Sequence, residues 1–353
     1  MTSTAEHLRN ALDGRWRDIK NAMRARLSDE IFRPHYTPNT VIARAKVAEQ
    51  LKIMAAAGAA EDGFRKEHGG NGDVGAAITQ IEMLAMSDLS LMVKAGVQWG
   101  LFGGAIENLG TERHHKAYVR RLIDLDLLGC FAMTETGHGS DVQSLETTAT
   151  YDPETQEFVI HSPTPSARKD YIGGAAETAR VATVFAQLIT PDGEGHGVHC
   201  FVVPIRDDMG NDMPGVTTSD CHYKGGLPGV DNGRIVFDHV RVPRENLLNR
   251  YADVAPRRHL QLTDREPGPA VLHHAGHADP RPGHRRGQCR GGRSGRPRHS
   301  HPLCPGTQAV RSSQERRGSA HHGLSRASAP PAAADREVLC AAVRPERAGG
   351  QMP

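Results

Sequence analysis

The first 128 residues carry apolar side chains at the spacing of amphipathic helices. Val47, Leu51 and Met54 recur at i, i+4 and i+7, which places them on one face of a helix. Asn39 precedes this stripe as a preferred N-cap residue, and Gly58 follows it as a stop. The pattern predicts an α-helical domain over residues 1–128.

Two further helices are predicted in the same region. Asp73 can cap a helix with one apolar stripe, and Thr111 begins a strongly charged helix that runs to about Asp124. The stripe that we expect to be buried in the first of these helices consists of Val74, Ile78, Ile81 and Ala85.

From Gly129 onward the apolar period changes from helical to alternating, which is typical of strands. The predicted strands lie at residues 158–160, 181–189, 198–205 and 235–237. Turn signals stand between them at Asp152-Pro153, Pro191-Asp192-Gly193 and Asp231-Asn232-Gly233. These features predict an α+β chain with a middle β domain over residues 129–250.

The last 97 residues, 257–353, contain no Phe, Tyr, Trp, Ile, Lys or Asn, yet hold 17 Arg and 9 His. A segment rich in Pro, Gly, Arg and Ser with few large apolar groups cannot offset the entropy of ordering its chain. We therefore expect residues 251–353 to form a disordered basic tail.

The residue types missing from the tail are mostly those with A- and T-rich codons, which indicates GC-rich DNA translated in the wrong frame. Back-translation of residues 257–268 followed by a shift of one base gives DGTYSSPIENPG, and the same shift yields further strings with helical apolar spacing. We infer one extra base in a C run near Pro256. Sequencing the DNA at that codon tests this hypothesis.

Charge and cysteine usage narrow the class of protein. The net charge of +2 combines a tail of 17 Arg against 7 acidic residues with a body of 26 Lys and Arg against 34 Asp and Glu. The six Cys include no CxxC pair, so neither a zinc framework nor a disulfide scaffold is indicated. Without a run of 18 apolar residues or a leader at Met1, we expect no membrane span, no secretory signal and a cytoplasmic location.

The densest group of polar and glycine residues is the segment 131–142, at the junction of the helical and β regions. Its glycines allow a backbone to approach a ligand closely, and Thr134, Thr136 and Ser140 offer hydroxyls to a planar heterocycle or a phosphate. A turn that joins two domains needs the same residue types. Spacing alone leaves a ligand loop and a structural turn equally open.

Other candidate residues have simpler interpretations. Glu135 fits a capping or solvated role better than that of a base, and His138 fits a turn residue that shapes the loop. The segment 193–197 resembles a phosphate loop but lies between two strands, where a hairpin tip is expected. His114-His115 lacks the i, i+4 spacing of a helical metal site and belongs to a helix expected to be exposed, so no metal is assigned.

The content of the junction segment carries a family resemblance. Residues 133–142, MTETGHGSDV, and the following 145–152, LETTATYD, resemble the flavin-binding stretch of acyl-CoA oxidases, within the acyl-CoA dehydrogenase superfamily. Further matches, in order and at the family's spacing, are residues 201–206, 231–233 and 242–248. The resemblance covers about residues 30–254.

This resemblance implies an N-terminal helical domain, a middle β-barrel domain and a C-terminal helical domain that this chain replaces with its tail. It also implies FAD, a fatty acyl-CoA substrate and α,β-dehydrogenation to trans-2-enoyl-CoA, with molecular oxygen reduced to hydrogen peroxide. Thr134 matches a flavin-contacting Thr, and Gly173 matches a Gly whose backbone faces the flavin. Asp170-Tyr171 stands where many relatives carry two Trp.

Four residues of the loop are carried over more weakly, as contacts for acyl-CoA or as residues that shape the loop. They are Gly137, His138, Gly139 and Ser140. In the family the catalytic base is a Glu of the C-terminal helical half, so no residue of this chain receives that role. We therefore expect the chain to be inactive as translated.

Three alternatives remain beside an acyl-CoA oxidase. They are an acyl-CoA dehydrogenase with another electron acceptor, a non-catalytic module whose basic tail binds polyanions, and a pseudogene product. Nucleic-acid binding beyond non-specific contacts of the tail is not expected, because aromatic residues for stacking are missing there. Relatives form homodimers largely through the C-terminal half, so self-association of this chain is not expected.

Overall fold

The structure is a computed structural model that describes residues 3–255 and 260–262. The reading-frame hypothesis, the basic binding arm and the disorder expected for residues 263–353 therefore lie outside the described residues. Every described residue belongs to one compact unit of the chain.

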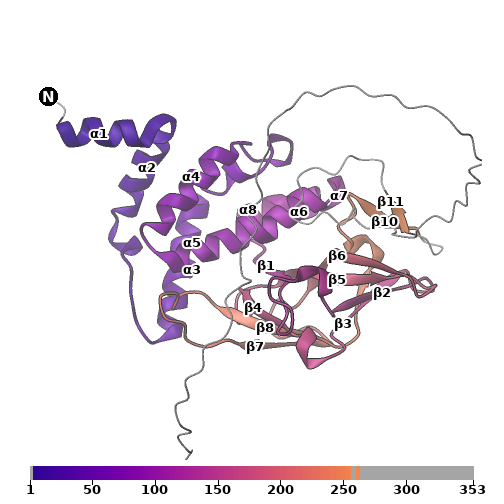
Figure 1. Cartoon of the computed structure of the whole chain (residues 1–353). Coiled ribbons are helices and arrows are strands. Elements are labelled where there is room, and N and C mark those ends of the chain that lie inside the picture. Colours follow the sequence, from indigo (N-terminus) through magenta and orange to yellow (C-terminus); the bar gives the residue numbers. More distant parts are fainter. Residues whose placement is uncertain (1–2, 256–259, 263–353) are drawn as a thin grey trace, which may run out of the picture. The chain divides into compact units, whose positions relative to one another are not determined.

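The N-terminal part is helical, as the apolar spacing predicts (Figure 1). Its helices, among which η5 and η6 have π-helical hydrogen bonding, are α1 Thr4–Asp13, α2 Arg17–Leu27, α3 Thr40–Ala56, α4 Val74–Ala85, α5 Leu89–Ala95, η5 Gly96–Gly103, α6 Gly104–Leu109, α7 Glu112–His114, η6 His115–Val119 and α8 Arg120–Ile123.

Helix α3 confirms the prediction made for it. Asn39 is its N-cap, with Oδ1 accepting from the backbone N–H groups of Val41 at 3.1 Å and Ile42 at 3.3 Å. The three residues of the predicted stripe, Val47, Leu51 and Met54, are buried.

Helix α4 has the predicted cap but the opposite buried face. Asp73 Oδ1 accepts from Ala76 N at 3.0 Å, as expected. Val74 and Ile78, however, are 63% and 65% exposed, while Ala76, Thr79 and Met83 are buried. The helix is apolar on both sides, so its period could not decide which side faces the core.

The segment Leu89–Leu109, which joins α5, η5 and α6, is one continuous helix that is long and apolar enough to cross a membrane by length and composition. In this structure 56% of the most apolar 18-residue stretch of the segment is buried inside the protein. Leu91, Phe102 and Ile106 are completely buried in the helical core. Core packing therefore accounts for its apolar composition.

The charged helix predicted from Thr111 is present as α7, η6 and α8, but it is not an exposed helix. His114, His115, Val119 and Leu122 are all buried. The charged residues lie on the opposite side of the helix. With about 3.6 residues per turn, a helix can expose Arg and Lys on one face while it buries apolar residues and His on the other.

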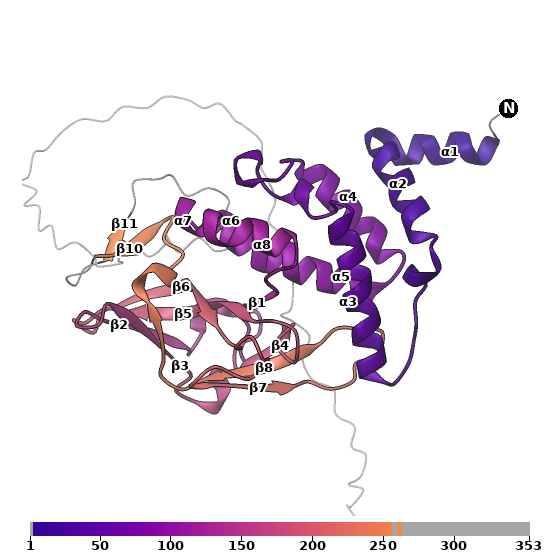
Figure 2. The same cartoon turned by 180° about the vertical axis from the view of Figure 1, so that it is seen from behind.

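Strands follow from residue 129, and the two larger sheets differ in pairing (Figure 2). A six-stranded mixed sheet has the order β1-β5-β2-β3-β9 with β6 added to β5, and a three-stranded sheet has the order β4-β8-β7. The strands are β1 Gly129–Ala132, β2 Thr148–Asp152, β3 Glu157–His161, β4 Lys169–Gly173, β5 Val181–Ile189, β6 Gly195–Pro204, β7 Val216–Asp220, β8 Asn232–Phe237, β9 Val240–Pro243, β10 Ala252–Val254 and β11 Leu260–Leu262.

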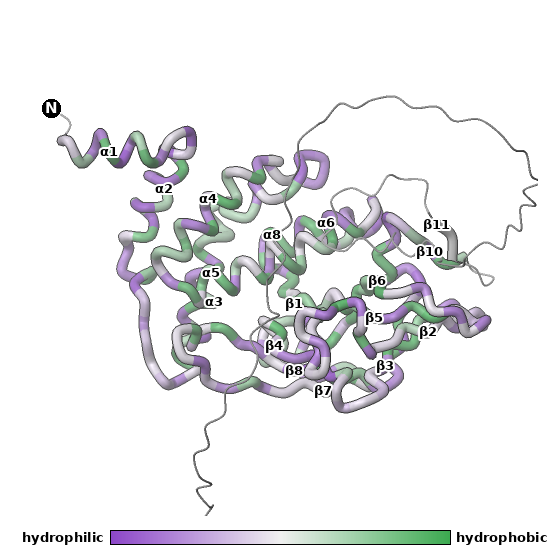
Figure 3. Tube along the Cα trace, viewed as in Figure 1, coloured by the Kyte–Doolittle hydropathy of each residue, from purple (hydrophilic) through white to green (hydrophobic). Residues whose placement is uncertain are grey.

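The six-stranded sheet lies between two hydrophobic cores. In β5, Phe185 packs with the helices, whereas Val184 and Ala186 pack toward the three-stranded sheet. In β6, Val202 and Phe201 divide in the same way, because successive side chains of a strand point to opposite faces. Both strands are therefore hydrophobic along much of their length (Figure 3), as expected of strands buried on two faces.

Three turn signals have different outcomes. The turns after Asp152 and at residues 190–193 are present, and the latter is the expected hairpin tip between β5 and β6. Asp231-Asn232-Gly233 is not a turn, because Asn232 already begins β8. Asp231 is buried instead and accepts from Lys94 Nζ at 2.6 Å.

The start of the expected tail also differs from its prediction. β10 and β11 form a two-stranded antiparallel sheet with Ala252 opposite Leu262 and Val254 opposite Leu260. Residues 252–254 and 260–262 are therefore ordered strands. Helices end at Ile123 and strands begin at Gly129, while the division of the chain into domains at 128 and 250 stays a prediction.

Gly129 is the point of closest approach between the helical segment and the six-stranded sheet. A Cβ atom at this position would lie 2.3 Å from the Phe102 ring, well inside contact distance. The backbone N–H of Gly129 donates to Gln98 Oε1 at 2.9 Å, so β1 is fixed against η5. Only glycine fits there without moving a buried aromatic ring.

We predict that Gly129→Ala lowers the free energy of unfolding by about 1–3 kcal/mol through overpacking. Gly96→Ala is the matched control, because open space surrounds that helical position and alanine favours helix by up to about 1 kcal/mol. Urea unfolding followed by circular dichroism measures both. Equal stability of the two variants would contradict the close packing at Gly129.

Candidate functional site

The segment after β1 continues as an extended chain whose side chains alternate in burial. Met133 and Glu135 are buried, while Thr134 and Thr136 are exposed. The segment pairs with β4 through hydrogen bonds from Asp170 N to Thr134 O at 3.1 Å and from Thr136 N to the Arg168 carbonyl at 2.9 Å. This pairing fixes which threonines face outward.

Glu135 and Lys169 form an ion pair inside the protein. Lys169 Nζ lies 2.9 Å from Glu135 Oε1, and both side chains are completely buried. Lys169 also donates to the carbonyl oxygens of Met133 at 3.1 Å and Phe185 at 2.7 Å. Burial lowers the pKa of Lys169 to about 8, and the charge of Glu135 opposes that effect.

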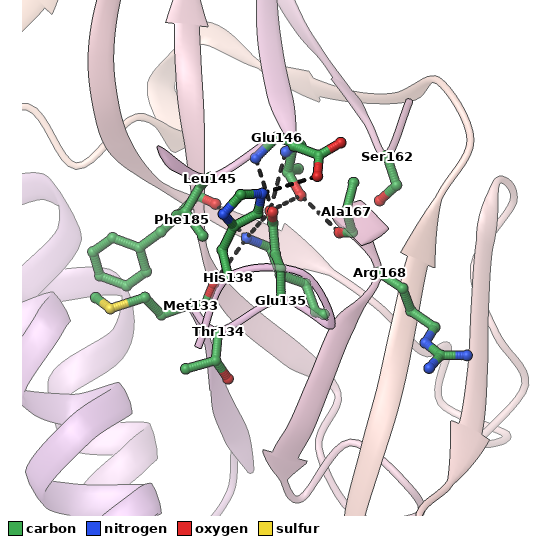
Figure 4. A network of polar contacts seen from close by, with 12 residues as sticks. Met133, Thr134, Glu135, His138, Leu145, Glu146, Ser162, Ala167, Arg168 and Phe185 are labelled. Carbon is green, nitrogen blue, oxygen red and sulfur yellow. Dashed lines mark hydrogen bonds and ion pairs between the residues drawn. The ribbon is translucent and has the colours of Figure 1, made fainter. Parts of the chain in front are cut away.

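The Glu135 carboxylate has donors on both oxygens. Oε2 accepts from Glu146 N at 2.8 Å, and Oε1 accepts from Thr147 N at 3.0 Å and Thr147 Oγ1 at 2.6 Å. Figure 4 shows Glu135 at the centre of this network, with Thr134 directed away from it. The solvated role expected for Glu135 is therefore wrong, because the carboxylate is buried and its hydrogen bonds and ion pair hold the loop in place.

The outward threonines lie beside a charged cluster at the start of β4. Thr134 Oγ1 donates to the Asp170 carbonyl at 2.9 Å, and Thr136 Oγ1 donates to Asp170 Oδ2 at 3.0 Å. Burial alone would raise the pKa of Asp170, but bonds from Thr136 and Arg168 and the charge of Arg234 outweigh it and lower this pKa. Asp170 therefore stays ionised and orients both Thr136 and Arg168.

Tyr171 is exposed next to these threonines in an uncommon backbone conformation. Its φ is +57° and its residue surface is 64% exposed. A non-glycine residue with positive φ persists only where its surroundings hold it. Asn232 Nδ2 donates to the Tyr171 carbonyl at 2.7 Å, which supplies one such restraint.

Gly173 ends β4 against the long helix. A Cβ atom there would lie 2.9 Å from Val97 Cγ2, so a larger residue would displace η5. Gly173 also lines a small cavity with Val97, Gln98 and Gly129. The structure thus places Gly173 at the same helix–strand junction as Gly129, three residues along the chain from Asp170.

The loop from Gly137 to Ser140 forms a closed turn with a histidine–carboxylate contact. His138 Nε2 lies 2.9 Å from Glu146 Oε1, and Thr164 and Ser166 donate to the same carboxylate at 2.5 and 2.7 Å. Hydrogen bonds from Thr164, Ser166 and His138 lower the pKa of Glu146 to about 2. These contacts agree with His138 as a residue that shapes the loop.

The glycines of the loop have different surroundings. A Cβ atom on Gly137 would lie 2.8 Å from Ser166 Cβ, whereas nothing lies within 4 Å of the same position on Gly139. Gly139 and Ser140 are exposed. Gly137 therefore serves packing within the turn, while Gly139 and Ser140 are accessible to a ligand.

An apolar groove that the sequence did not reveal runs beside this site. It lies between the long helix and β1 and β5, and its lining includes Phe185, which is seen beside Met133 in Figure 4. Its lining residues are Gly100, Leu101, Gly104, Ala105, Asn108, Leu109, Phe131 and Phe185. The one sequence signal was Gly100 and Gly104, which are spaced one helical turn apart in an apolar helix and leave the backbone uncovered.

The comparisons with known proteins match this region. Residues 130–240 match the family model described as acyl-CoA dehydrogenase, middle domain. The peroxisomal acyl-coenzyme A oxidase 3 of Arabidopsis thaliana is 50% identical over 175 residues, which are 50% of this chain and 26% of that protein. Half of this chain is homologous to acyl-CoA oxidases.

Solved structures agree with this homology. Acyl-CoA oxidase 3 of Yarrowia lipolytica has a TM-score of 0.61 at 33% identity and covers 70% of this chain and 34% of its own. Acyl-CoA oxidase-1 of Caenorhabditis elegans, crystallised with FAD and ATP, has a TM-score of 0.56 at 26% identity and covers 70% of this chain and 37% of its own. The expected fold, helices followed by a middle β domain, is confirmed.

This acyl-CoA oxidase-like chain spans about a quarter of the length of the curated relatives it matches, since the first of them is covered over 26%. Several of those relatives, including Peroxisomal acyl-coenzyme A oxidase 3 of Homo sapiens at 45% identity over 50% of this chain and 25% of that protein, are named peroxisomal. The cytoplasmic location expected from the sequence is not confirmed by these names.

We predict that Lys169→Met lowers the free energy of unfolding by about 3–5 kcal/mol, because it leaves the Glu135 charge buried without its cation. The double variant Lys169→Met with Glu135→Gln removes that charge as well and regains part of the loss. Urea unfolding of the two single variants and the double variant measures the coupling.

Lys116→Met is the control for this prediction, because Lys116 and Glu112 form a pair whose side chains are 75% and 79% exposed. Removal of that surface pair should change stability by less than about 1 kcal/mol. A loss in Lys169→Met no larger than in Lys116→Met would refute the role of the internal pair.

Proposed function

We propose that this chain is the N-terminal and middle portion of an FAD-dependent acyl-CoA oxidase. The observation that carries the proposal is the outward row of Thr134 and Thr136 beside the exposed Tyr171, on a loop fixed from inside by Glu135 and Lys169. The homology to acyl-CoA oxidases over the same residues supports it.

The donor set of this face fits a flavin. The hydroxyl oxygens of Thr134 and Thr136 donate their hydrogens to Asp170 and keep lone pairs that can accept from an N–H of an isoalloxazine ring. The exposed phenol ring of Tyr171 offers an apolar surface for a planar ring, in the place where many relatives of the family have Trp. When bound, FAD would supply the hydride acceptor of the reaction.

The residues of this chain would bind and orient the reactants. Thr134 and the Gly173 backbone would hold the cofactor edge, and the network behind them prevents the loop from shifting. Such fixed geometry matters because a misplacement of about 1 Å between reacting atoms costs roughly 10²-fold in rate. Gly139 and Ser140, both exposed, are the accessible loop residues for contacts with acyl-CoA.

The apolar groove fits a fatty acyl chain. Leu101 and Phe131 supply its hydrophobic surface, and Gly104 leaves room for methylene groups beside the helix. Burying each methylene in such a groove contributes about 0.8 kcal/mol. A fatty acyl thioester is the substrate that we propose for this groove, and α,β-dehydrogenation by an oxidase is the reaction we propose.

The base that removes the α-proton is not assigned to a described residue. Glu135, Glu146 and Asp170, the carboxylates around the described site, are each held by cationic or hydrogen-bonding partners. We infer that the base comes from sequence encoded by the shifted frame after Pro256, and that the chain as translated is inactive. The names of the relatives favour oxygen as electron acceptor and the peroxisome as location, while dimer formation stays a prediction.

We predict that FAD, titrated into the purified chain and followed by flavin fluorescence, binds about fivefold more weakly to Thr134→Val, because one hydrogen bond is worth roughly 1 kcal/mol. Thr217→Val, the same change at an exposed position of β7, is the control and should bind FAD as the unaltered chain does. Equal affinity in the two variants would remove Thr134 from the cofactor site.

Restoring the reading frame at Pro256 tests the activity itself. The restored protein should release hydrogen peroxide with a long-chain acyl-CoA, whereas the chain as given should release none. Peroxide production by the unaltered chain would overturn its inactivity, and a restored protein that binds no FAD would overturn the proposed function.

A further inference from the structure

A second group of potential ligands lies in the helical part, away from the loop of Glu135. His68, on the short 3₁₀ turn η4 Lys66–His68, meets Glu107 of α6 and His115 of η6, and their ligand atoms lie within 4.8 Å of one another. His68 Nδ1 is 2.7 Å from Glu107 Oε2. The rings of His68 and His115 are 3.9 Å apart at their centroids and tilted by 35°.

His115 is the unusual member of this group. It is only 8% exposed, and neither Nδ1 nor Nε2 makes a hydrogen bond of good geometry to a described residue, although the Glu107 backbone lies near enough to favour its charged form. A buried polar group without a partner costs roughly 1–3 kcal/mol, so the fold alone gives no reason for a histidine here. The polar edge of this ring is therefore open to a further partner, a water molecule or a metal ion.

Both ring nitrogens of the neighbouring His114, by contrast, have hydrogen-bond partners. His114 Nδ1 accepts from Thr111 N at 3.0 Å, and His114 Nε2 lies 3.0 Å from the Glu245 carbonyl. The two residues are adjacent in the chain and almost equally buried. The lack of partners at His115 is therefore specific to its position beside His68 and Glu107.

Two neutral imidazoles and one carboxylate form a recognised ligand set for divalent zinc and related ions. His115 also begins a π-helical segment, a local distortion that often marks functional positions in helices.

Among the described residues, Arg65 is the cation that pairs with the Glu107 carboxylate. Its Nε lies 3.5 Å from Glu107 Oε1, while Oε2 faces His68. Arg65 is partly exposed and also lies 4.0 Å from Glu67, so it has a second acidic partner. A metal ion at Oε2 would not need to displace Arg65 from Oε1.

We propose that His68, Glu107 and His115 form a binding site for a divalent first-row transition-metal ion such as Zn²⁺, with water completing its coordination. The ion would connect the η4 turn to α6 and η6, which lie much further along the chain. Its role is structural, and it does not depend on the proposed oxidase activity. No metal was predicted from the sequence, because the local spacing of His114 and His115 does not fit a metal site. The sequence does not reveal that His68 and Glu107 lie next to His115.

Another group, His161, Asp238 and His239, also meets the distance criterion for a metal site. His239 and Asp238 are largely exposed, and His239 Nδ1 already lies 2.7 Å from Asp238 Oδ1. His161 Nδ1 is also a buried atom without a hydrogen-bond partner, but the His161 side chain is 30% exposed. It serves as the comparison site in the experiment.

The test is a titration of the full chain with Co²⁺, followed by its visible absorption, and with Zn²⁺, followed by calorimetry and by the thermal midpoint. His115→Phe keeps a stacked ring and removes both nitrogens, and His68→Gln removes a second ligand. His239→Asn is the control for other histidines. Histidines and cysteines of residues 257–353 are present in every variant, so differences between variants report on the described clusters.

We expect the unaltered chain and His239→Asn to bind one ion at this site. His115→Phe and His68→Gln should bind that ion at least about tenfold more weakly, and Zn²⁺ should no longer raise their thermal midpoint. Circular dichroism shows whether each variant folds. If His115→Phe does not fold, the result for His68→Gln decides the outcome. Unchanged Co²⁺ absorption and affinity in the folded variants, or loss only in His239→Asn, would overturn the proposal.

Discussion

The buried ion pair of Lys169 and Glu135 is the interaction on which the candidate site depends. It joins the segment after β1 to β4, and Lys169 also donates to the Phe185 carbonyl of β5. Because the backbone and hydroxyl of Thr147 satisfy the carboxylate, the pair has hydrogen-bonding partners that compensate the cost of burial. With Glu135 held inward, the alternation of the chain turns Thr134 outward.

Much of the fold was predictable because its signals are local. The cap of α3 at Asn39, the strand Val181–Ile189 and the hairpin after it follow from neighbouring residues. The buried face of α4 was not predictable, since Val74 and Ile78 belong to one apolar side and Met83 to another. Only the packing of α2 and α5 against that helix decides between them.

In the candidate site, too, features set by neighbouring residues could be predicted, whereas features set by residues far apart in the sequence could not. Thr134 lies in a motif that the sequence reveals, but Lys169, which fixes it, is 35 residues further along and carries no local signal. The exposed helix expected around His115 was wrong for a related reason. Its neighbours His68 and Glu107 come from other segments, so adjacency with His114 was the only visible pattern.

The helix–sheet junction couples the two halves of the proposed site. Gly129 and Gly173 both approach η5, one against Phe102 and the other against Val97. Gln98 of the same helix accepts from Gly129 N and donates to the carbonyl oxygens of Leu122 and Leu127 at 3.1 and 2.9 Å. A larger residue at either glycine would move the helix that lines the apolar groove and also the strand that presents the cofactor face. Under the proposed function, the spacing at these glycines would set the distance between an acyl chain and a flavin.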